Sequence, residues 1–154
     1  MQTLEREAIP AFAFINVKSP RYRADTLLRH LKRSQPDSID YTLGLLNKDI
    51  STTKRTADGA IKQPESKYAD WGIFGLGYRP GPSCVVSTHR LKAAGADKMM
   101  ERLKKVCMHE IGHNLGLPHC EQSTTCVMRD AAEKIATVDN VELKLCEHCK
   151  ARIR

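Results

Sequence analysis

The stretch that decides the fold reads His109-Glu110-Ile111-Gly112-His113-Asn114-Leu115-Gly116-Leu117-Pro118-His119. His109 and His113 are four residues apart, so on a helix both imidazoles project from one face toward a single metal ion. Glu110 lies beside them and can take a proton from a metal-bound water without being a ligand. Gly116 can adopt the left-handed conformation that ends a helix. The chain can then reverse and return His119 as a third ligand, which leaves a fourth position for water.

The segments on either side of this motif predict two helices. Asp97 is a candidate cap for a long helix that runs into the motif. Apolar side chains recur with helical spacing along one face of it, at Met99, Leu103, Val106, Cys107 and Ile111. Further on, Asp139 is followed by Glu142 at the spacing of a capping box, so we expect a last helix to start at Asp139.

The first half of the chain predicts a small sheet and one helix. The apolar run 11–17 predicts a buried strand, and residues 39–46 alternate well enough to form a second strand. Between them, residues 24–34 place leucines at helical spacing, which predicts an amphipathic helix that packs on the first strand. Residues 48–70 are polar and contain an Asp-Gly turn signal, so we expect a long surface connection there.

Residues 71–78 and 83–88 predict two more strands joined by a Pro/Gly turn. The glycines of the first of these strands favour an edge position, where another backbone such as that of a substrate comes close. We expect an extended substrate to add to this strand. The candidate contacts are Gly75, Leu76, Gly77 and Tyr78. Tyr78 is also a candidate to stabilise an oxyanion.

Composition and charge favour a globular protein of 154 residues. Apolar residues make up 41% and charged residues 28%, which argues against disorder, and no stretch is long enough for a membrane span. The net charge of +7 comes from 25 Lys and Arg against 18 Asp and Glu. These basic residues are scattered and match no nucleic-acid-binding pattern, so we interpret them as solvated faces that favour acidic partners over nucleic acid.

The length favours one catalytic domain over residues 1–154, with a sheet-and-helix part at 1–116 and a C-terminal part at 117–154. The first residues show no apolar signal segment, so we expect a cytoplasmic protein that does not enter the membrane. We also expect it to be a monomer.

Six cysteines are the second informative feature, because four of them crowd into the last 35 residues. Without a signal segment, metal binding is favoured over disulfides. A redox role for Cys146 and Cys149, which form a Cys-x-x-Cys, is the third possibility. Cys84 and Cys107 match no ligand position and are predicted to be buried free thiols. If these cysteines bind a metal ion, His148, which lies inside the Cys-x-x-Cys, could replace one of the thiolates as a ligand.

The motif and the residues after it resemble one branch of the metzincin clan, the archaemetzincins. In that family the third histidine is followed by an adjacent Cys, a second Cys with x-Met after it, and a Cys-x-x-Cys about seventeen residues later. This chain reads His119-Cys120, then Cys126-Val127-Met128, then Cys146-Glu147-His148-Cys149. Five residues separate Cys120 from Cys126 where the family more usually has four, which indicates a slightly longer loop. The similarity covers residues 70–149 strongly and the N-terminal part weakly.

The resemblance implies a role for each matching position. His109, His113 and His119 would hold a catalytic zinc ion, and Glu110 would be the general base. Met128 would be the methionine of the Met-turn beneath that zinc. A second, structural zinc would be held by Cys120, Cys126, Cys146 and Cys149, and four thiolates do make a closed tetrahedral set.

The fold implied is α/β (α+β), metzincin-like, with a small mixed sheet, an active-site helix and a short C-terminal part stapled by zinc. The implied function is hydrolysis of peptide bonds in a peptide or protein substrate, with two Zn²⁺ per chain. One alternative is a non-catalytic zinc-binding interaction module. The other is a redox protein, which would show a dithiol–disulfide couple at Cys146 and Cys149 and no zinc.

Overall fold

A computed structural model describes residues 2–93, 95–131 and 134–153. Its elements in chain order are the 3-10 turn η1 (Ala11–Ala13), β1 (Phe14–Asn16), β2 (Pro20–Arg23), α1 (Ala24–Ser34), β3 (Thr42–Leu46), β4 (Ile50–Thr52), α2 (Glu65–Tyr68), β5 (Trp71–Ile73), β6 (Gly75–Gly77), β7 (Ser83–Ser87), α3 (Ala96–Asn114), α4 (Ile135–Asn140) and α5 (Glu147–Lys150).

The strands form two small mixed sheets rather than one. One has the order β1-β2-β4-β5, and the other has the order β3-β7-β6. The pairs β2/β4 and β3/β7 are parallel, whereas the remaining pairs are antiparallel. The predicted α+β class with mixed strand directions is therefore confirmed, and β6 lies at a sheet edge as expected.

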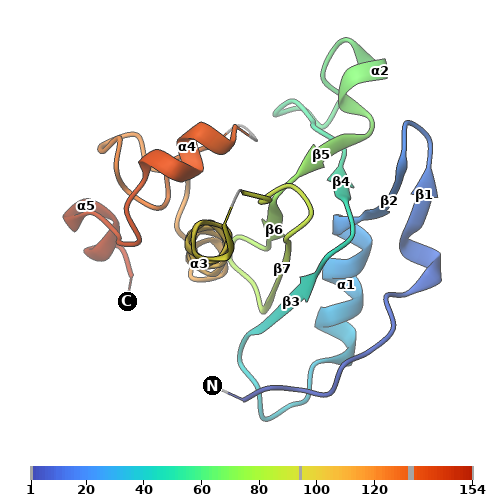
Figure 1. The fold of residues 1–154 in the computed structure, drawn as a ribbon, viewed down its shortest axis with the longest axis horizontal. Helices are drawn as coiled ribbons and strands as arrows, with labels where there is room; N and C mark the ends of the chain where they lie inside the picture. Colours follow the sequence, from blue (N-terminus) through green and yellow to red (C-terminus); the bar gives the residue numbers. More distant parts are fainter. Residues whose placement is uncertain (1, 94, 132–133, 154) are drawn as a thin grey trace.

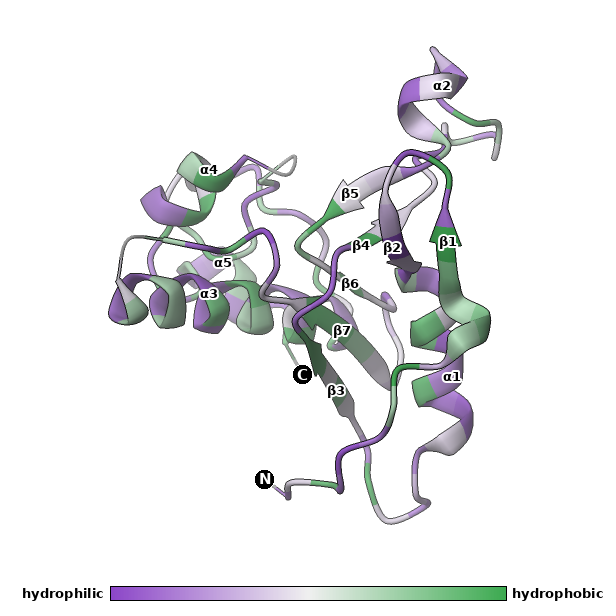
Figure 2. Cartoon of the chain, turned by 45° about the vertical axis from the view of Figure 1, so that its right-hand side comes forward, coloured by the Kyte–Doolittle hydropathy of each residue, from purple (hydrophilic) through white to green (hydrophobic). Residues whose placement is uncertain are grey.

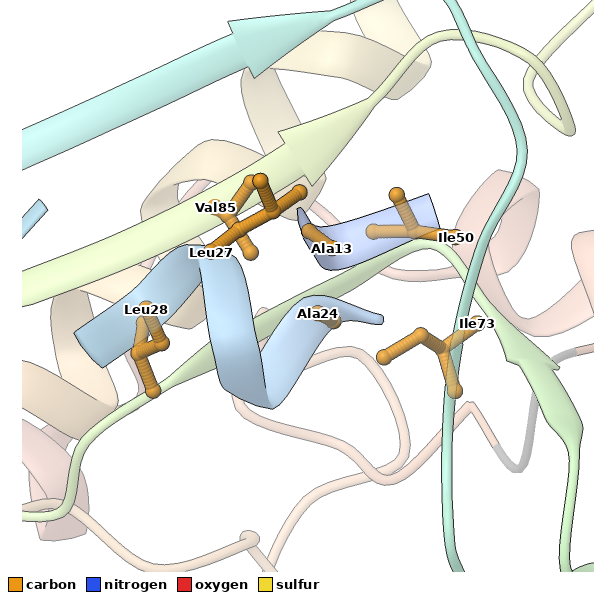
Figure 3. Close-up of a cluster of buried hydrophobic side chains, with 7 residues drawn as sticks. All are labelled: Ala13, Ala24, Leu27, Leu28, Ile50, Ile73 and Val85. Atoms are coloured by element: carbon orange, nitrogen blue, oxygen red, sulfur yellow. The ribbon is translucent and has the colours of Figure 1, made fainter. Parts of the chain in front are cut away.

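Strand β7 is the centre of the fold, because helices cover both of its faces. All five of its residues are buried, as expected for a strand that reads as a continuous apolar run. Val85 packs in the cluster beside α1 (Figure 3), and Val86 packs in the cluster beside α3. Beyond α3, on the side away from the sheets, lie α4 and α5 (Figure 1). Helix α3 is therefore shared by the sheets and the C-terminal segment.

The amphipathic helix predicted at residues 24–34 is confirmed as α1, with the same bounds. Its Leu27 and Leu28 are buried together with Ala13, Ile50 and Ile73 (Figure 3). Figure 2 shows hydrophobic and hydrophilic residues in alternating bands along α1 and α3, as amphipathic helices require. Helix α1 contacts the predicted first strand through η1, where Ala13 is buried, and its main partner is β7.

The apolar run 11–17 is not a buried strand. It forms η1 and the short edge strand β1, which pairs with β2, and both Phe12 and Val17 are exposed. Residues 48–70 are also more ordered than a surface connection. They contain β4, which lies inside its sheet, where Ile50 is fully buried. The sequence did not predict this strand, because the polar Asp49 just before it suggested an exposed segment. In the structure the carboxylate of Asp49 is buried, 3.4 Å from Arg21 and 2.6 Å from Arg90.

Two predictions for the second half need correction. Helix α3 begins at Ala96 after the cap residue Gly95, and its Ile111 is 38% exposed, so this residue does not belong to the buried face. Asp139 does not start a helix but lies near the end of α4. Its carboxylate accepts hydrogen bonds of 2.7 Å from Nε and Nη2 of Arg102, so the side chain joins two helices and caps neither.

Among the described residues, no helix combines the length and the apolar character needed to cross a membrane.

Candidate metal centres

Three histidines meet where α3 ends and the following chain turns back. The nitrogens that His109, His113 and His119 can offer to a metal all lie within 4.8 Å of one another. Nε2 of His113 is 3.1 Å from Nε2 of His109. Two nitrogens bound to one zinc ion at about 2.05 Å and the tetrahedral angle lie about 3.3 Å apart. The observed spacing therefore fits a zinc ion between the rings.

Backbone carbonyls fix the tautomers of two of these rings. Nδ1 of His109 donates to the carbonyl oxygen of Val127 at 2.8 Å, and Nδ1 of His113 donates to that of Leu117 at 2.7 Å. Because a carbonyl can only accept, each Nδ1 carries the proton and each Nε2 keeps its lone pair. On the third ring, Nδ1 of His119 lies 3.7 Å from Oδ2 of Asp130.

The electrostatics keep the three imidazoles neutral. Burial lowers the pKa of His113 to about 4, with smaller contributions from His109 and Arg79. Burial is also the main cause of the lowered pKa values of His109 and His119. Neutral imidazole is the form that binds a metal, so these rings can act as ligands at neutral pH.

Glu110 is 7% exposed and faces the same space from the next position of α3. Strand β6 packs closely against it. A Cβ on Gly75 would lie 2.8 Å from Cγ and Oε1 of Glu110, and a Cβ on Gly77 would lie 2.7 Å from its carbonyl oxygen. The sequence suggested that these glycines admit a substrate backbone. In the structure they admit helix α3, which brings the carboxylate to the strand.

The three histidines border a cleft of about 390 Å³. It runs along β6, and it is lined by Gly75, Leu76 and Gly77 on that side. Its apolar walls come from α3, α4 and neighbouring segments and include Phe74, Val106, Val138 and Val141. Tyr78 does not line the cleft. Its ring packs against the α1 cluster, with Nζ of Lys32 5.6 Å from the ring centroid, so the structure does not favour it as an oxyanion stabiliser.

Met128 lies beneath the histidines. Its side chain is fully buried, and a Cβ added to Gly112 would collide with its sulfur atom. Gly112 lies on α3 between His109 and His113, so the sulfur touches the helix at the turn that carries both rings. This close contact explains why glycine stands at that position of the motif.

Four thiols gather in the segment that follows the histidine motif. The sulfurs of Cys120, Cys126, Cys146 and Cys149 lie within 4.8 Å of one another. Those of Cys120 and Cys146 are 3.7 Å apart, and those of Cys126 and Cys149 are 3.8 Å apart. Sulfurs on one zinc ion at about 2.3 Å lie about 3.8 Å apart, whereas a disulfide needs about 2.05 Å. The spacing therefore fits a tetrahedral metal site, and His148 is not part of the cluster.

The start of α5 favours ionised sulfur. The backbone N–H of Cys149 donates to the thiol of Cys146, which is the main reason that the pKa of Cys146 falls to about 7. In the absence of a metal, burial raises the pKa of Cys126 and Cys149. A bound cation would reverse this, because a coordinated thiol is deprotonated.

The two remaining cysteines are free thiols close to Glu110. Cys84 is buried as predicted, and Cys107 is only partly buried. Burial, followed by the charge of Glu110, raises the pKa of Cys84 to about 12 and that of Cys107 to about 11. Both thiols therefore stay protonated and unreactive at neutral pH.

Sequence reasoning missed Asn114 and most of the charged lining of the cleft. Nδ2 of Asn114 donates to the carbonyl oxygens of Tyr78 (3.1 Å) and Ser83 (2.7 Å), which ties the β6–β7 turn to the end of α3. The charged residues come from separate segments and share no motif. They are Lys54, Arg79, Lys105, Arg129 and Asp130.

Comparison with known proteins gives consistent matches. The sequence profile of Peptidase family M54 matches residues 8–154. An archaemetzincin of Archaeoglobus fulgidus is 32% identical over 139 residues, which are 90% of this chain and 72% of that protein. An archaemetzincin of Natronomonas pharaonis is 41% identical over 91 residues, and the match spans about half of that protein (51%). The crystal structure of Methanopyrus kandleri archaemetzincin aligns with a TM-score of 0.74 at 30% identity, over 94% of this chain and 70% of that one.

Proposed function

This chain belongs to peptidase family M54, and from that premise we propose that it is a zinc metallopeptidase acting on peptide or protein substrates. The observation that carries the proposal is the set of three neutral imidazoles, two of them with Nε2 atoms 3.1 Å apart, beside a carboxylate in one cleft. Three protein ligands leave a position open for water, as catalytic zinc sites do.

The ligands of the proposed catalytic zinc are His109, His113 and His119. When bound, zinc supplies an acidified water and polarises the scissile carbonyl. Glu110 accepts the proton of the attacking water and passes it to the leaving amine. The carbonyl oxygens of Val127 and Leu117 hold the rings of His109 and His113 in place for this step.

The free edge of β6 is the proposed substrate platform. Among the described strands β6 pairs with β7 alone, so its other edge offers backbone N–H and C=O groups to an extended peptide. The cleft runs along this edge and brings it together with Glu110 and the three histidines. A peptide hydrogen-bonded there lies over the reacting groups.

We also propose that Cys120, Cys126, Cys146 and Cys149 bind a second, structural zinc, so that the chain carries two zinc ions. The tetrahedral spacing of the sulfurs supports this assignment. The first two of these cysteines follow the histidine motif, whereas Cys146 precedes α5 and Cys149 lies within it. The ion therefore staples residues 117–154 together within one catalytic domain that also includes residues 1–116.

The test of the activity is a peptide-library digest with the zinc-loaded protein and with Glu110→Ala. The variant is expected to keep its fold and its zinc, because Glu110 is not a ligand, and to lose about 10²–10⁴ in rate. Zinc content and circular dichroism check that the variant is intact. Cleavage by Glu110→Ala at the wild-type rate would contradict its role as the base.

A further inference from the structure

The walls of the cleft carry more positive than negative charge. Four basic side chains line it, namely Lys54, Arg79, Lys105 and Arg129. The acidic side chains that line it are Glu110 and Asp130. Glu110 is the proposed base, and Asp130 faces His119. Two carboxylates cannot balance the charge of four basic groups.

Lys105 is neutralised within the fold. Its ammonium group lies 2.6 Å from Oε1 of Glu101 and donates to the carbonyl oxygen of Asp139 at 3.1 Å. The side chain is almost completely buried. It therefore supports the wall between α3 and α4 and adds little net charge to the cleft.

Arg79 and Arg129 differ from Lys105, because neither guanidinium makes an ion pair with any residue that the structure describes. They come from separate segments of the chain. Arg79 follows β6, whereas Arg129 follows Met128 in the segment after the histidine motif. Two unpaired cations thus face one cleft together with the candidate catalytic groups.

The backbone that carries Arg79 is held firmly. Asn114, which is 2% exposed, donates to the carbonyl oxygens of Tyr78 and Ser83 on either side of the turn. The N–H of Gly81 donates to the carbonyl oxygen of Asn114 at 3.3 Å. Arg79 is also close enough to influence His113 and His119 electrostatically. The backbone from which Arg79 projects is therefore fixed at the turn beside the histidines.

We propose that Arg79 and Arg129 form a subsite that selects substrates by a carboxylate, and this rests on the proposed peptidase function. The carboxylate belongs either to an Asp or Glu side chain near the scissile bond or to the C-terminus of a short peptide. A guanidinium presents paired N–H donors that match both oxygens of a carboxylate. The net charge of +7 adds a long-range attraction for acidic peptides.

The test compares matched peptides that differ in one charge. One series replaces Glu by Gln at each position around the cleaved bond, and the other replaces the free C-terminus by an amide. Wild-type protein is expected to prefer the charged member by about 10-fold in kcat/KM in at least one series. The series that shows the preference identifies the source of the carboxylate. Equal rates in both series would overturn the proposal.

The double variant Arg79→Gln/Arg129→Gln is expected to reduce this preference to about 2-fold or less, because glutamine keeps donors but not charge. Arg33→Gln is the matched control, since Arg33 is an exposed arginine of α1 and is not part of the cleft. It removes one positive charge outside the cleft, so it controls for a lower net charge, and it should keep the wild-type preference. A preference unchanged in the double variant would also overturn the proposal.

Binding to Glu110→Gln separates this inference from the peptidase proposal, because that measurement needs no hydrolysis. Fluorescence anisotropy with labelled Glu and Gln peptides should show the same charge preference, and added salt should weaken it. Hydrolysis without any charge preference would overturn the subsite and leave the peptidase. If the wild type binds acidic peptides selectively but hydrolyses none, the subsite is supported and the peptidase proposal is overturned.

Discussion

The two candidate metal centres of this chain share the segment that follows α3, where His119 and Cys120 are adjacent, but they differ in chemistry. The histidine centre uses neutral ligands held by carbonyl groups and faces a cleft. The cysteine centre uses four sulfurs packed in an apolar cluster with Leu117 and Met128. An open site with neutral ligands suits an ion that does chemistry, whereas a closed set of thiolates suits an ion that holds the chain together. Ligand type and access, more than ligand count, therefore separate the two roles.

Loss of one thiolate should have the greatest consequence. Cys149→Ser should lower the free energy of unfolding by several kcal/mol, because the binding energy of a structural zinc is folding energy. Thermal melting and zinc content are the measurements. Cys107→Ser is the matched control, since that thiol belongs to neither metal cluster and should change stability by about 1 kcal/mol or less. Equal melting temperatures for both variants would remove the structural role of the cysteine centre.

The next prediction concerns how the stability of the metal-free protein depends on pH through the histidine centre. The pKa of His113 is about 4 in the folded chain, whereas the ordinary value of 6.5 applies to the unfolded chain. The unfolded state therefore binds the proton first, and folded stability falls as the pH drops from about 6.5 to about 4. The loss from this residue is about 2–3 kcal/mol.

Urea unfolding of chelator-treated protein at several pH values measures this effect. His113→Gln should make the pH dependence in that range less steep, because glutamine does not titrate there, and the remainder comes from His109 and His119. His30→Gln, a substitution on α1 away from both centres, should not. A wild-type stability that rises as the pH falls toward 4 would contradict the assignment of a neutral His113.

The sequence alone predicted some elements of the fold and missed others. Local patterns sufficed for α1 and for the ligand spacing of the histidine motif, because each depends on residues within a few turns of one another. The β4 strand was missed because its position depends on Asp49 pairing with Arg21 and Arg90, which are distant in sequence. The helix start predicted at Asp139 was wrong for the same reason, because its carboxylate pairs with Arg102, which is also distant in sequence.

The site itself was predictable only as far as its motif. His109, Glu110 and His113 lie on one helix, so their proximity follows from helical geometry, and the turn at Gly116 returns His119 to them. The glycines of β6 were correctly placed at an edge, but their neighbour is α3. The charged walls of the cleft come from turns in different parts of the chain, and their meeting point depends on the tertiary fold.

A smaller effect tests the packing of α3 against β6. Gly75→Ala places a Cβ 2.8 Å from Cγ and Oε1 of Glu110, so the carboxylate must shift. We expect kcat/KM to fall about 10-fold, because positioning errors of this size are costly to catalysis. Both zinc ions should remain. Gly95→Ala is the control, since a Cβ there meets nothing within 4 Å. Equal kinetics for the two variants would show that Glu110 tolerates the displacement.

Zinc analysis combined with thiol titration during graded chelation distinguishes the two centres in a single experiment. Two zinc ions are expected in the untreated chain. Mild chelation should remove one ion, abolish hydrolysis and leave the fold in place, because the open site can exchange its water for a chelator atom. Stronger chelation should remove the second ion, loosen residues 117–154 and expose four further reactive thiols. A single zinc per chain, or a disulfide between Cys146 and Cys149 in freshly purified protein, would contradict the presence of two metal centres.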